Sequence, residues 1–485
     1  MKKLFAVLLA LCIMAGALCI TAFAEDGADV IRVSGLKRDG ELIAIASYPN
    51  HAEGWEAAID LAKDSQYMTD GSYDRIVVDL LADWTAVEGE FCNSGDGFSY
   101  DAIRFYENTR ITLNMNGHTI NRGLKAWQYN GEVIFIDDGA DVIINGGKSG
   151  DSITAPGEAA GNAPMGTITG GFSTNGAGGI HMQDAVVTLN NVCLVGNTVE
   201  DDDGAAIAVH DGGTLTMNGG CMSNNLLTSW GSESWANSRG TLYVDDSTAV
   251  LRQVEISGNT TSVYHQDGVA VALNGDSEVT LEDCIVENNG GGTYSDSIFF
   301  SFDKDSTLYI NKSTIRNNKA NDGVFYGFGK IRMDGCTFTN NHSDNGIFSD
   351  SGNDDMDCEV SNSVFKDNPT CVVWLFPRSS NADSIYKFTK CTFSNNGFEK
   401  DYSIECGSKV QFEMIDCDLG NDVIQNKQYI QFTDSDAENG VGSIFGRGSL
   451  TMIIAFVALV VSIASFTVNV TAKRKPAEAK TETDK

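Results

Sequence analysis

The fold is decided by a nine-residue stretch at residues 281–289, which reads LEDCIVENN. Its pattern is apolar-x-x-small-x-apolar-x-x-Asn, and residues 189–197, which read LNNVCLVGN, repeat it. The pattern occurs nine times without a gap inside the unit, and its last positions are 23 to 34 residues apart. These last positions are Asn197, Asn225, Asn259, Asn289, Asn318, Asn341, Asn368, Asn396 and Asp422.

Within each unit, apolar and polar residues alternate, which is the period of a β-strand. A second alternating stretch lies between units, as at residues 180–182, 207–209, 269–271 and 298–300. One period therefore holds about three short strands, and periods of this length bury a core only by stacking. Stacked coils lie ~4.8 Å apart, so that equivalent residues form columns and the asparagines can hydrogen-bond along the axis. The pattern predicts an all-β parallel β-helix of about a dozen coils. A sandwich or a propeller is the alternative, disfavoured because no hairpin turns and no ~40-residue blade period occur.

Both ends of the chain carry apolar runs. Residues 4–20 follow two lysines and precede a small-x-small site at residues 22–24, which is typical of a secretory signal peptide. Residues 450–472 contain no charged residue and are followed by Lys473-Arg474-Lys475, which predicts a transmembrane helix with its carboxyl end in the cytoplasm. The predicted organisation is a signal peptide (1–24), a cap with a short helix and first strands (25–105), the β-helix (106–425), a linker (426–449), the membrane helix (450–472) and a cytoplasmic tail (473–485).

The strongly negative net charge of the chain excludes one class of binding partner. The chain has 33 Lys and Arg against 66 Asp and Glu, and the predicted exterior, residues 25–449, keeps 26 and 63 of them, a net charge of −37. Binding to nucleic acid needs clustered Lys and Arg on the protein, so this partner is excluded.

Three motifs resemble those of bacterial cell-surface proteins with pectin-lyase-like, right-handed parallel β-helix repeats. They are ITLNMNGHTINRGL at residues 111–124, LLADW at 80–84 and GTITGG at 166–171. The resemblance covers most of residues 50–425 and implies the right-handed fold and a cell-surface setting. It does not imply one activity, because the superfamily includes pectate lyases, polygalacturonases, adhesins and domains without a known ligand.

The catalytic motifs of these enzymes are not found. The Gly-His-Gly and Arg-Ile-Lys of polygalacturonases do not occur, and His118 lies in a different context, Asn-Gly-His-Thr. His181 and His210 lie on or just after predicted strands, and neither is singled out as a base. An enzyme of this fold should instead show aspartates with an Arg or Lys facing them along one sheet. We predict no catalytic residue on this basis.

Several aspartates lie three residues before the apolar residue that opens a strand, and they should stack at one corner of the coil. Two readings are open: Asx-turns that close the corner, or a row of Ca²⁺ sites, since hard cations prefer several oxygen ligands. The candidate calcium ligands are Asp184, Asp246, Asp276 and Asp305. No other cofactor is predicted.

Two patches are candidates for ligand binding. The longest period contains Trp230, Trp235 and Arg239 in a loop that should overhang the coil. The second patch combines aromatic residues of successive coils, Phe299, Phe325, Tyr326 and Trp374, some of which must face outward. The alternative for both patches is packing onto or into the rod.

These observations predict a membrane-anchored, extracellular binding module, adhesin-like, for a glycan or a partner protein. The alternative is a polysaccharide lyase or glycoside hydrolase of the same fold. Four cysteines, Cys284, Cys336, Cys391 and Cys417, share one inward column. Most are two coils apart, beyond disulfide reach, and only the last two lie on adjacent coils, so we expect reduced, buried thiols.

Overall fold

The computed structural model describes residues 28–67, 73–86, 103–148, 165–229, 239–262, 268–291, 297–327, 329–350, 356–376, 384–408 and 410–433. The chain divides into a compact unit that ends at Phe432 and a second unit that begins at Thr433. The predicted signal peptide, membrane helix and tail lie outside the described residues. Within the described ranges, no helix is long and apolar enough to cross a membrane.

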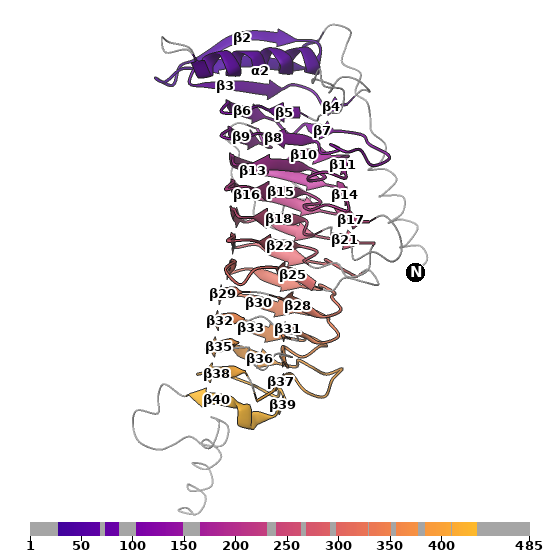
Figure 1. Cartoon of the computed structure of the whole chain (residues 1–485), viewed down its shortest axis with the longest axis vertical. Coiled ribbons are helices and arrows are strands. Elements are labelled where there is room, and N and C mark those ends of the chain that lie inside the picture. Colours follow the sequence, from indigo (N-terminus) through magenta and orange to yellow (C-terminus); the bar gives the residue numbers. More distant parts are fainter. Residues whose placement is uncertain are drawn as a thin grey trace, which may run out of the picture. The chain divides into compact units, whose positions relative to one another are not determined.

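Parallel strands of successive coils stack on one another along the first unit, as Figure 1 shows. In the described part they form three sheets, which we call sheets A, B and C, of 24, 12 and 4 strands. Sheet B has one strand for each coil, so its twelve strands agree with the predicted dozen coils. Sheet A takes a longer and a shorter strand from most coils, and these are continuous in β13 and β16.

The strands of sheet B are β5 (Ile103–Phe105), β8 (Ile134–Ile136), β12 (Ile180–Gln183), β15 (Ile207–His210), β18 (Leu242–Asp245), β22 (Val271–Asn274), β25 (Ser297–Ser301), β28 (Gly323–Tyr326), β31 (Gly346–Asp350), β34 (Val373–Leu375), β37 (Ile404–Cys406) and β39 (Ile424–Gln425). Sheet C contains β11 (Phe172–Ser173), β14 (Thr198–Glu200), β17 (Leu226–Thr228) and β21 (Thr260–Thr261).

Sheet A contains β1 (Ile31–Leu36), β2 (Leu42–Tyr48), β3 (Arg75–Leu80), β4 (Trp84–Thr85), β6 (Arg110–Asn114), β7 (Thr119–Asn121), β9 (Asp141–Asn145), β10 (Gly166–Thr169), β13 (Val186–Val195), β16 (Thr214–Ser223), β19 (Thr248–Arg252), β20 (Glu255–Ser257), β23 (Glu278–Glu282), β24 (Ile285–Glu287), β26 (Thr307–Asn311), β27 (Thr314–Arg316), β29 (Lys330–Asp334), β30 (Thr337–Thr339), β32 (Asp357–Ser361), β33 (Val364–Lys366), β35 (Ile385–Thr389), β36 (Thr392–Ser394), β38 (Gln411–Ile415) and β40 (Ile430–Thr433). A short 3-10 helix, η1 (Lys427–Tyr429), precedes β40.

The asparagine column is confirmed, and it is a hydrogen-bonded ladder. The Nδ2 of Asn289 donates to the Oδ1 of Asn318 at 3.1 Å and to the carbonyl of Ile256 at 2.8 Å. The same contacts recur from Asn197 to Asn396, whose Nδ2 donates to Asp422 at 2.6 Å. Each asparagine after Asn197 also accepts a bond from the backbone N–H of the preceding ladder residue, as the Oδ1 of Asn318 does from Asn289, and Asn197 accepts one from the N–H of Gly171. This satisfies buried backbone groups where each coil turns out of sheet A.

The inward positions of the repeat form one continuous core. Val286 and Phe338 are fully buried, as predicted. Phenylalanines stack between adjacent coils, with ring centroids 4.7 Å apart for Phe338 and Phe365 and 5.1 Å for Phe365 and Phe393. A charge placed in this column would have no partner there.

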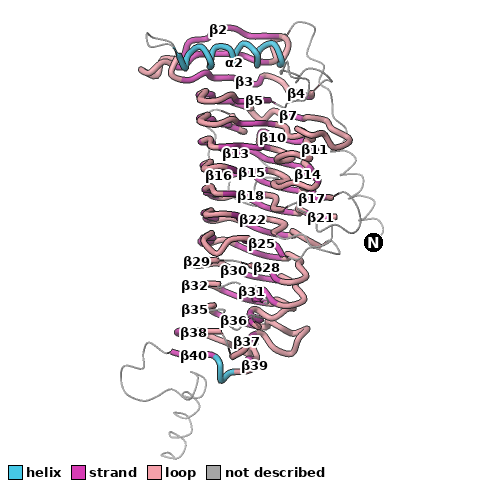
Figure 2. The backbone as a smooth tube through the Cα atoms, in the orientation of Figure 1, coloured by secondary structure: helices cyan, strands magenta, loops and turns pink. Residues whose placement is uncertain are grey.

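The amino-terminal end of the rod is covered by a cap. The predicted helix is α2 (His51–Tyr67), and it lies beside β2 and β3 in Figure 2. Trp55 and Ala58 of α2 are buried in the core, and Trp55 meets the Phe105 ring of the first sheet B strand at 5.0 Å. The antiparallel pairing of β1 with β2 and β3 precedes the first coil and was not predicted.

The cysteines follow the prediction in part. Cys284, Cys336 and Cys391 are buried free thiols, and Cys417 is half-buried and free. Cys193 and Cys221, however, form a disulfide between register partners on adjacent coils, with Cα atoms 4.4 Å apart. They lie one position after the small residue of the repeat, so they belong to a different column from the four thiols.

Candidate functional site

The outer face of sheet B carries one unusual column of side chains. Strand register aligns His181 with Ala208, Tyr243, Ala272, Phe300 and Tyr326 on successive coils. The column continues through Ser349, the partner of Trp374, to Glu405. From β12 to β34 this is seven steps, or ~34 Å at ~4.8 Å a step. The column is therefore as long as an extended ligand, but most of its side chains are buried, and Tyr326, Trp374 and Glu405 are its half-buried members.

Five rings on this face form what we call the aromatic strip: Phe300, Phe302, Tyr326, Trp374 and Phe376. Phe302 is 41% exposed and packs edge-on against Phe300, with ring centroids 4.2 Å apart. Phe300 is stacked with Tyr326 at 5.9 Å, and Trp374 is tilted against Phe376 at 5.2 Å. Tyr326, Trp374 and Phe376 are half-buried. The strip offers partly exposed ring faces over several coils.

The predicted aromatic patch is half right. Tyr326 and Trp374 lie on the outer face, but Phe299 and Phe325 are fully buried, so their assignment to a binding surface is wrong. Their rings stack on each other inside the core at 4.7 Å. Side chains alternate along β25, so that Phe299 points inward and Phe300 points outward. The prediction named Phe299, whereas Phe300 is the residue on the outer face.

Next to the strip lies a group that we call the polar cluster: His181, Asp203, His210, Arg239, Tyr243 and Asp245. The rings of His181 and His210 lie 5.2 Å apart, and His210 lies 5.5 Å from Tyr243. The Nδ1 of His210 is 3.7 Å from a carboxylate oxygen of Asp245. These strand residues alternate along β12, β15 and β18, which brings their side chains to one face.

Asp203 and Arg239 come from the turns that lead into β15 and β18. Their nearest charged atoms, Oδ2 and one guanidinium nitrogen, are 3.8 Å apart. The Arg239 guanidinium also lies over the Phe302 ring, 4.1 Å from its centroid. Arg239 therefore joins the polar cluster to the aromatic strip. It was a predicted binding residue, whereas its predicted neighbours Trp230 and Trp235 lie outside the described residues.

Burial changes the protonation of the cluster. It raises the pKa of the Asp203 carboxyl to about 8, against the opposing effect of Arg239. It lowers the pKa of the His181 imidazole to about 3, so this ring is neutral. It also raises the pKa of the Tyr243 phenol, which stays a hydrogen-bond donor. The cluster thus contains a neutral acid, a phenol and the neutral His181 ring, with Asp203 Oδ1 and His181 Nδ1 buried and unpaired among the described residues.

The aspartate corner, for which Asx-turns and calcium sites were the two open readings, shows contacts of the turn kind. Asp246 Oδ1 accepts a hydrogen bond from the Asp276 backbone N–H of the next coil at 2.9 Å, and Asp305 donates its backbone N–H to Asp303 at 3.0 Å. Asp184 and Asp246 adopt positive φ, which is typical of tight turns. No group of three or more His, Cys, Asp or Glu in the described ranges is placed to hold a metal ion. The Asp246 side chain therefore closes a turn, and calcium binding at the four positions stays a prediction.

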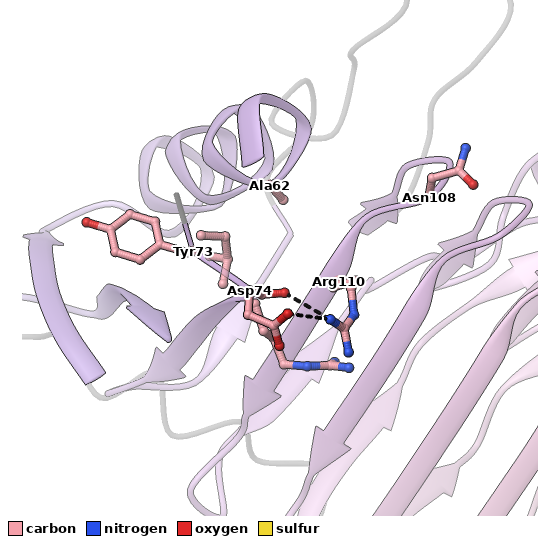
Figure 3. Close-up of a pocket in the computed structure, with 7 residues that line it drawn as sticks. Ala62, Tyr73, Asp74, Asn108 and Arg110 are labelled. Carbon is pink, nitrogen blue, oxygen red and sulfur yellow. Dashed lines mark hydrogen bonds and ion pairs between the residues drawn. The ribbon is translucent and has the colours of Figure 1, made fainter. Parts of the chain in front are cut away.

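A separate pocket lies under the cap, between α2 and the strands β3 and β6. Figure 3 shows Arg110 reaching Asp74, at 2.8 Å, in this pocket. Asp141 accepts bonds from Arg75 at 2.6 Å and Arg110 at 3.1 Å, which holds the pKa of its carboxyl below the ordinary value despite desolvation. Because these charged side chains pair with one another, we interpret the pocket as a structural contact that holds the cap on the first coils.

Comparison with known proteins gives one match. A family model described as a right-handed beta helix region matches residues 101–365 and, in a second overlapping pass, residues 236–418. These segments cover more than half of the chain, and they contain both the aromatic strip and the polar cluster. No curated protein and no solved structure matches the chain.

Proposed function

The chain belongs to the right-handed β-helix family, and we propose that its β-helix binds an extended polysaccharide along the outer face of sheet B. The observation that carries this proposal is the continuity of the aromatic strip with the polar cluster through Arg239. Ligand sites combine apolar and aromatic surface with a few polar groups that set orientation. Ring faces can stack on the apolar faces of sugars, and the polar cluster can bond their hydroxyls.

The chain ends support a surface role for this module. The predicted signal peptide at residues 1–24 would export it, and the predicted membrane helix at residues 450–472 would retain it at the cell membrane. The β-helix would then be displayed outside the cell as an adhesin-like rod. A partner protein that docks on the same rings is the other ligand class.

The test is binding of the purified full chain to a panel of polysaccharides. Tyr326→Ala and Trp374→Ala should each weaken binding about tenfold, or ~1.4 kcal/mol, because they remove stacking surface. The matched control is Tyr309→Ala, since Tyr309 is also half-buried and faces outward, but on sheet A. Equal losses in Tyr309→Ala and Tyr326→Ala would remove the strip from the binding site.

A second candidate function, polysaccharide cleavage, is favoured by one observation. The face shows one aspartate, Asp203, with an arginine beside it, which is part of the aspartate cluster and facing cation expected of an enzyme of this fold. A carboxyl with a pKa near 8 holds its proton at neutral pH and can serve as a general acid. If the chain cleaves polysaccharide, Asp203→Asn should abolish release of new chain ends while binding persists. A wild-type chain that binds but releases no product would exclude this function.

A further inference from the structure

We infer that the polysaccharide bound along sheet B is uncharged. This inference rests on the proposed function and names the ligand class of the same face. Its basis is the balance of fixed charge on and around the aromatic strip.

The cations of this face are already engaged. Arg104, the one Lys or Arg on the described sheet B strands, makes a two-pronged bond to Asp137 at 2.7 and 2.9 Å. Arg239 is held in place between the Asp203 carboxyl at 3.8 Å and the Phe302 ring at 4.1 Å, although Asp203, whose pKa is raised to about 8, does not neutralise the guanidinium at neutral pH. Carboxylate ligands are normally recognised by Arg in a free two-pronged geometry. Neither arginine offers that geometry to a ligand.

The anions of the face are not neutralised in the same way. Asp245 lies 3.7 Å from His210 and accepts a hydrogen bond from the Asn274 side-chain amide at 2.8 Å, but no Lys or Arg lies within ion-pair distance of it in the described ranges. Glu405 follows Trp374 in the outer column, and it has no Lys or Arg within ion-pair distance in the described ranges. Two carboxylates therefore flank the rings, one at each end. A polyuronate laid along the column would bring its own carboxylates close to both.

The charge of the whole chain acts in the same direction. Its formal net charge is −33, with 66 acidic against 33 basic residues. Such a field lowers the local concentration of anions and raises that of cations. An uncharged sugar chain pays no such penalty, and it can use both the ring faces and the neutral donors of the polar cluster. The face thus selects against charge as well as for sugar surface.

The experiment compares one polymer in two charge states. The full chain is titrated with a polyuronate, with the same polymer after methyl esterification of its carboxylates, and with neutral glucan, mannan and galactan. We expect neutral polymers to bind at least about tenfold more tightly than the polyuronate at low salt. Raising salt from about 0.01 to about 1 M shortens the screening length from ~30 to ~3 Å. Neutral binding should then change less than about twofold, whereas polyuronate binding should strengthen as the repulsion is screened.

Glu405→Gln provides the internal test, because it removes one flanking charge and keeps the side-chain shape. It should raise polyuronate affinity several-fold and leave the preference for neutral polymers in place. The matched control, Glu359→Gln, removes an exposed carboxylate from sheet A and should change neither affinity.

The outcomes separate this inference from the proposed function. Tighter binding of the polyuronate, weakened by salt, would overturn the uncharged ligand but keep a polysaccharide-binding face. Binding of none of these polymers would overturn both. Polymer binding that is indifferent to Tyr326→Ala and Trp374→Ala would show that another surface binds.

Discussion

Truncation of one ladder asparagine, Asn289→Ala, probes the feature that holds the coils in register. Its side chain is 1% exposed. The Nδ2 donates to Ile256 and Asn318, and the Oδ1 accepts from the backbone N–H and the Nδ2 of Asn259 at 3.1 and 2.9 Å. The substitution removes four buried hydrogen bonds at once.

The expected cost follows from what stays unpaired. The Asn259 Nδ2 keeps its bond to Met222, and the Asn318 Oδ1 keeps the backbone N–H of residue 289. The Ile256 carbonyl and the Asn259 N–H lose their side-chain partners. At ~1 kcal/mol for each lost bond, with unpaired buried groups costing ~1–3 kcal/mol, we expect a loss of ~3–4 kcal/mol in the free energy of unfolding. The control is Asn218→Ala, whose half-buried side chain makes one bond, to Asn190 at 3.0 Å, and should cost ~1 kcal/mol or less.

Two measurements read out this difference. Urea unfolding gives the global effect, and hydrogen exchange gives the local one, because solenoids can open coil by coil. Exchange should accelerate in residues 254–260 and 284–291 and remain slow near the cap. A loss of stability no larger than that of Asn218→Ala would refute the ladder as the source of register.

Four further predictions concern protonation, thiols and topology. The pKa of Asp203 is raised to about 8, so its carboxyl stabilises the folded state at low pH, and this stabilisation is lost as pH rises from about 4 to about 8. In melting experiments at different pH, Asp203→Asn should flatten the upper part of this decline in stability. The lowered pKa of His181, about 3, acts in the opposite sense, so its contribution is lost as pH falls below about 6.5, and His181→Phe should remove that loss. In denaturant without reductant, the seven free thiols of the described part should react with maleimide, whereas Cys193 and Cys221 should not; labelled Cys221 would contradict the disulfide. Protease added to intact cells should digest the β-helix and spare residues 473–485, and an exterior cleaved only after lysis would reverse the proposed topology.

The stacking of the coils was predictable because each coil repeats the same pattern of apolar and polar positions, and no coil can bury its apolar residues alone. The position of Asn289 and the inward direction of Val286 follow from a nine-fold pattern whose polar and apolar positions are unambiguous. Sheet B lacks this marker. In β25, residues 297–301 read SIFFS, so that apolar residues follow one another without alternating with polar ones. All five positions are buried, and the sequence therefore does not indicate which of Phe299 and Phe300 points into the core.

The polar cluster could not be assembled from the sequence for a different reason. Asp203 and Arg239 are 36 residues apart and meet only because their coils, of unequal length, stack on each other. The period between Asn225 and Asn259, 34 residues, is the longest among the nine repeats, so a constant period places Asp203 and Arg239 out of step. The Cys193–Cys221 bridge does not follow from the repeat, because these two cysteines lie one position after its small residue, in a different column from the other four thiols.

Footprinting of the full chain with its bound polysaccharide tests the central claim most directly. The exposed or half-buried rings of the aromatic strip, Phe302, Tyr326, Trp374 and Phe376, should become protected, while residues 330–334 of sheet A, on the same coils, should label as in the free chain. Protection confined to sheet A or to the cap, with the aromatic strip labelled as before, would contradict the account.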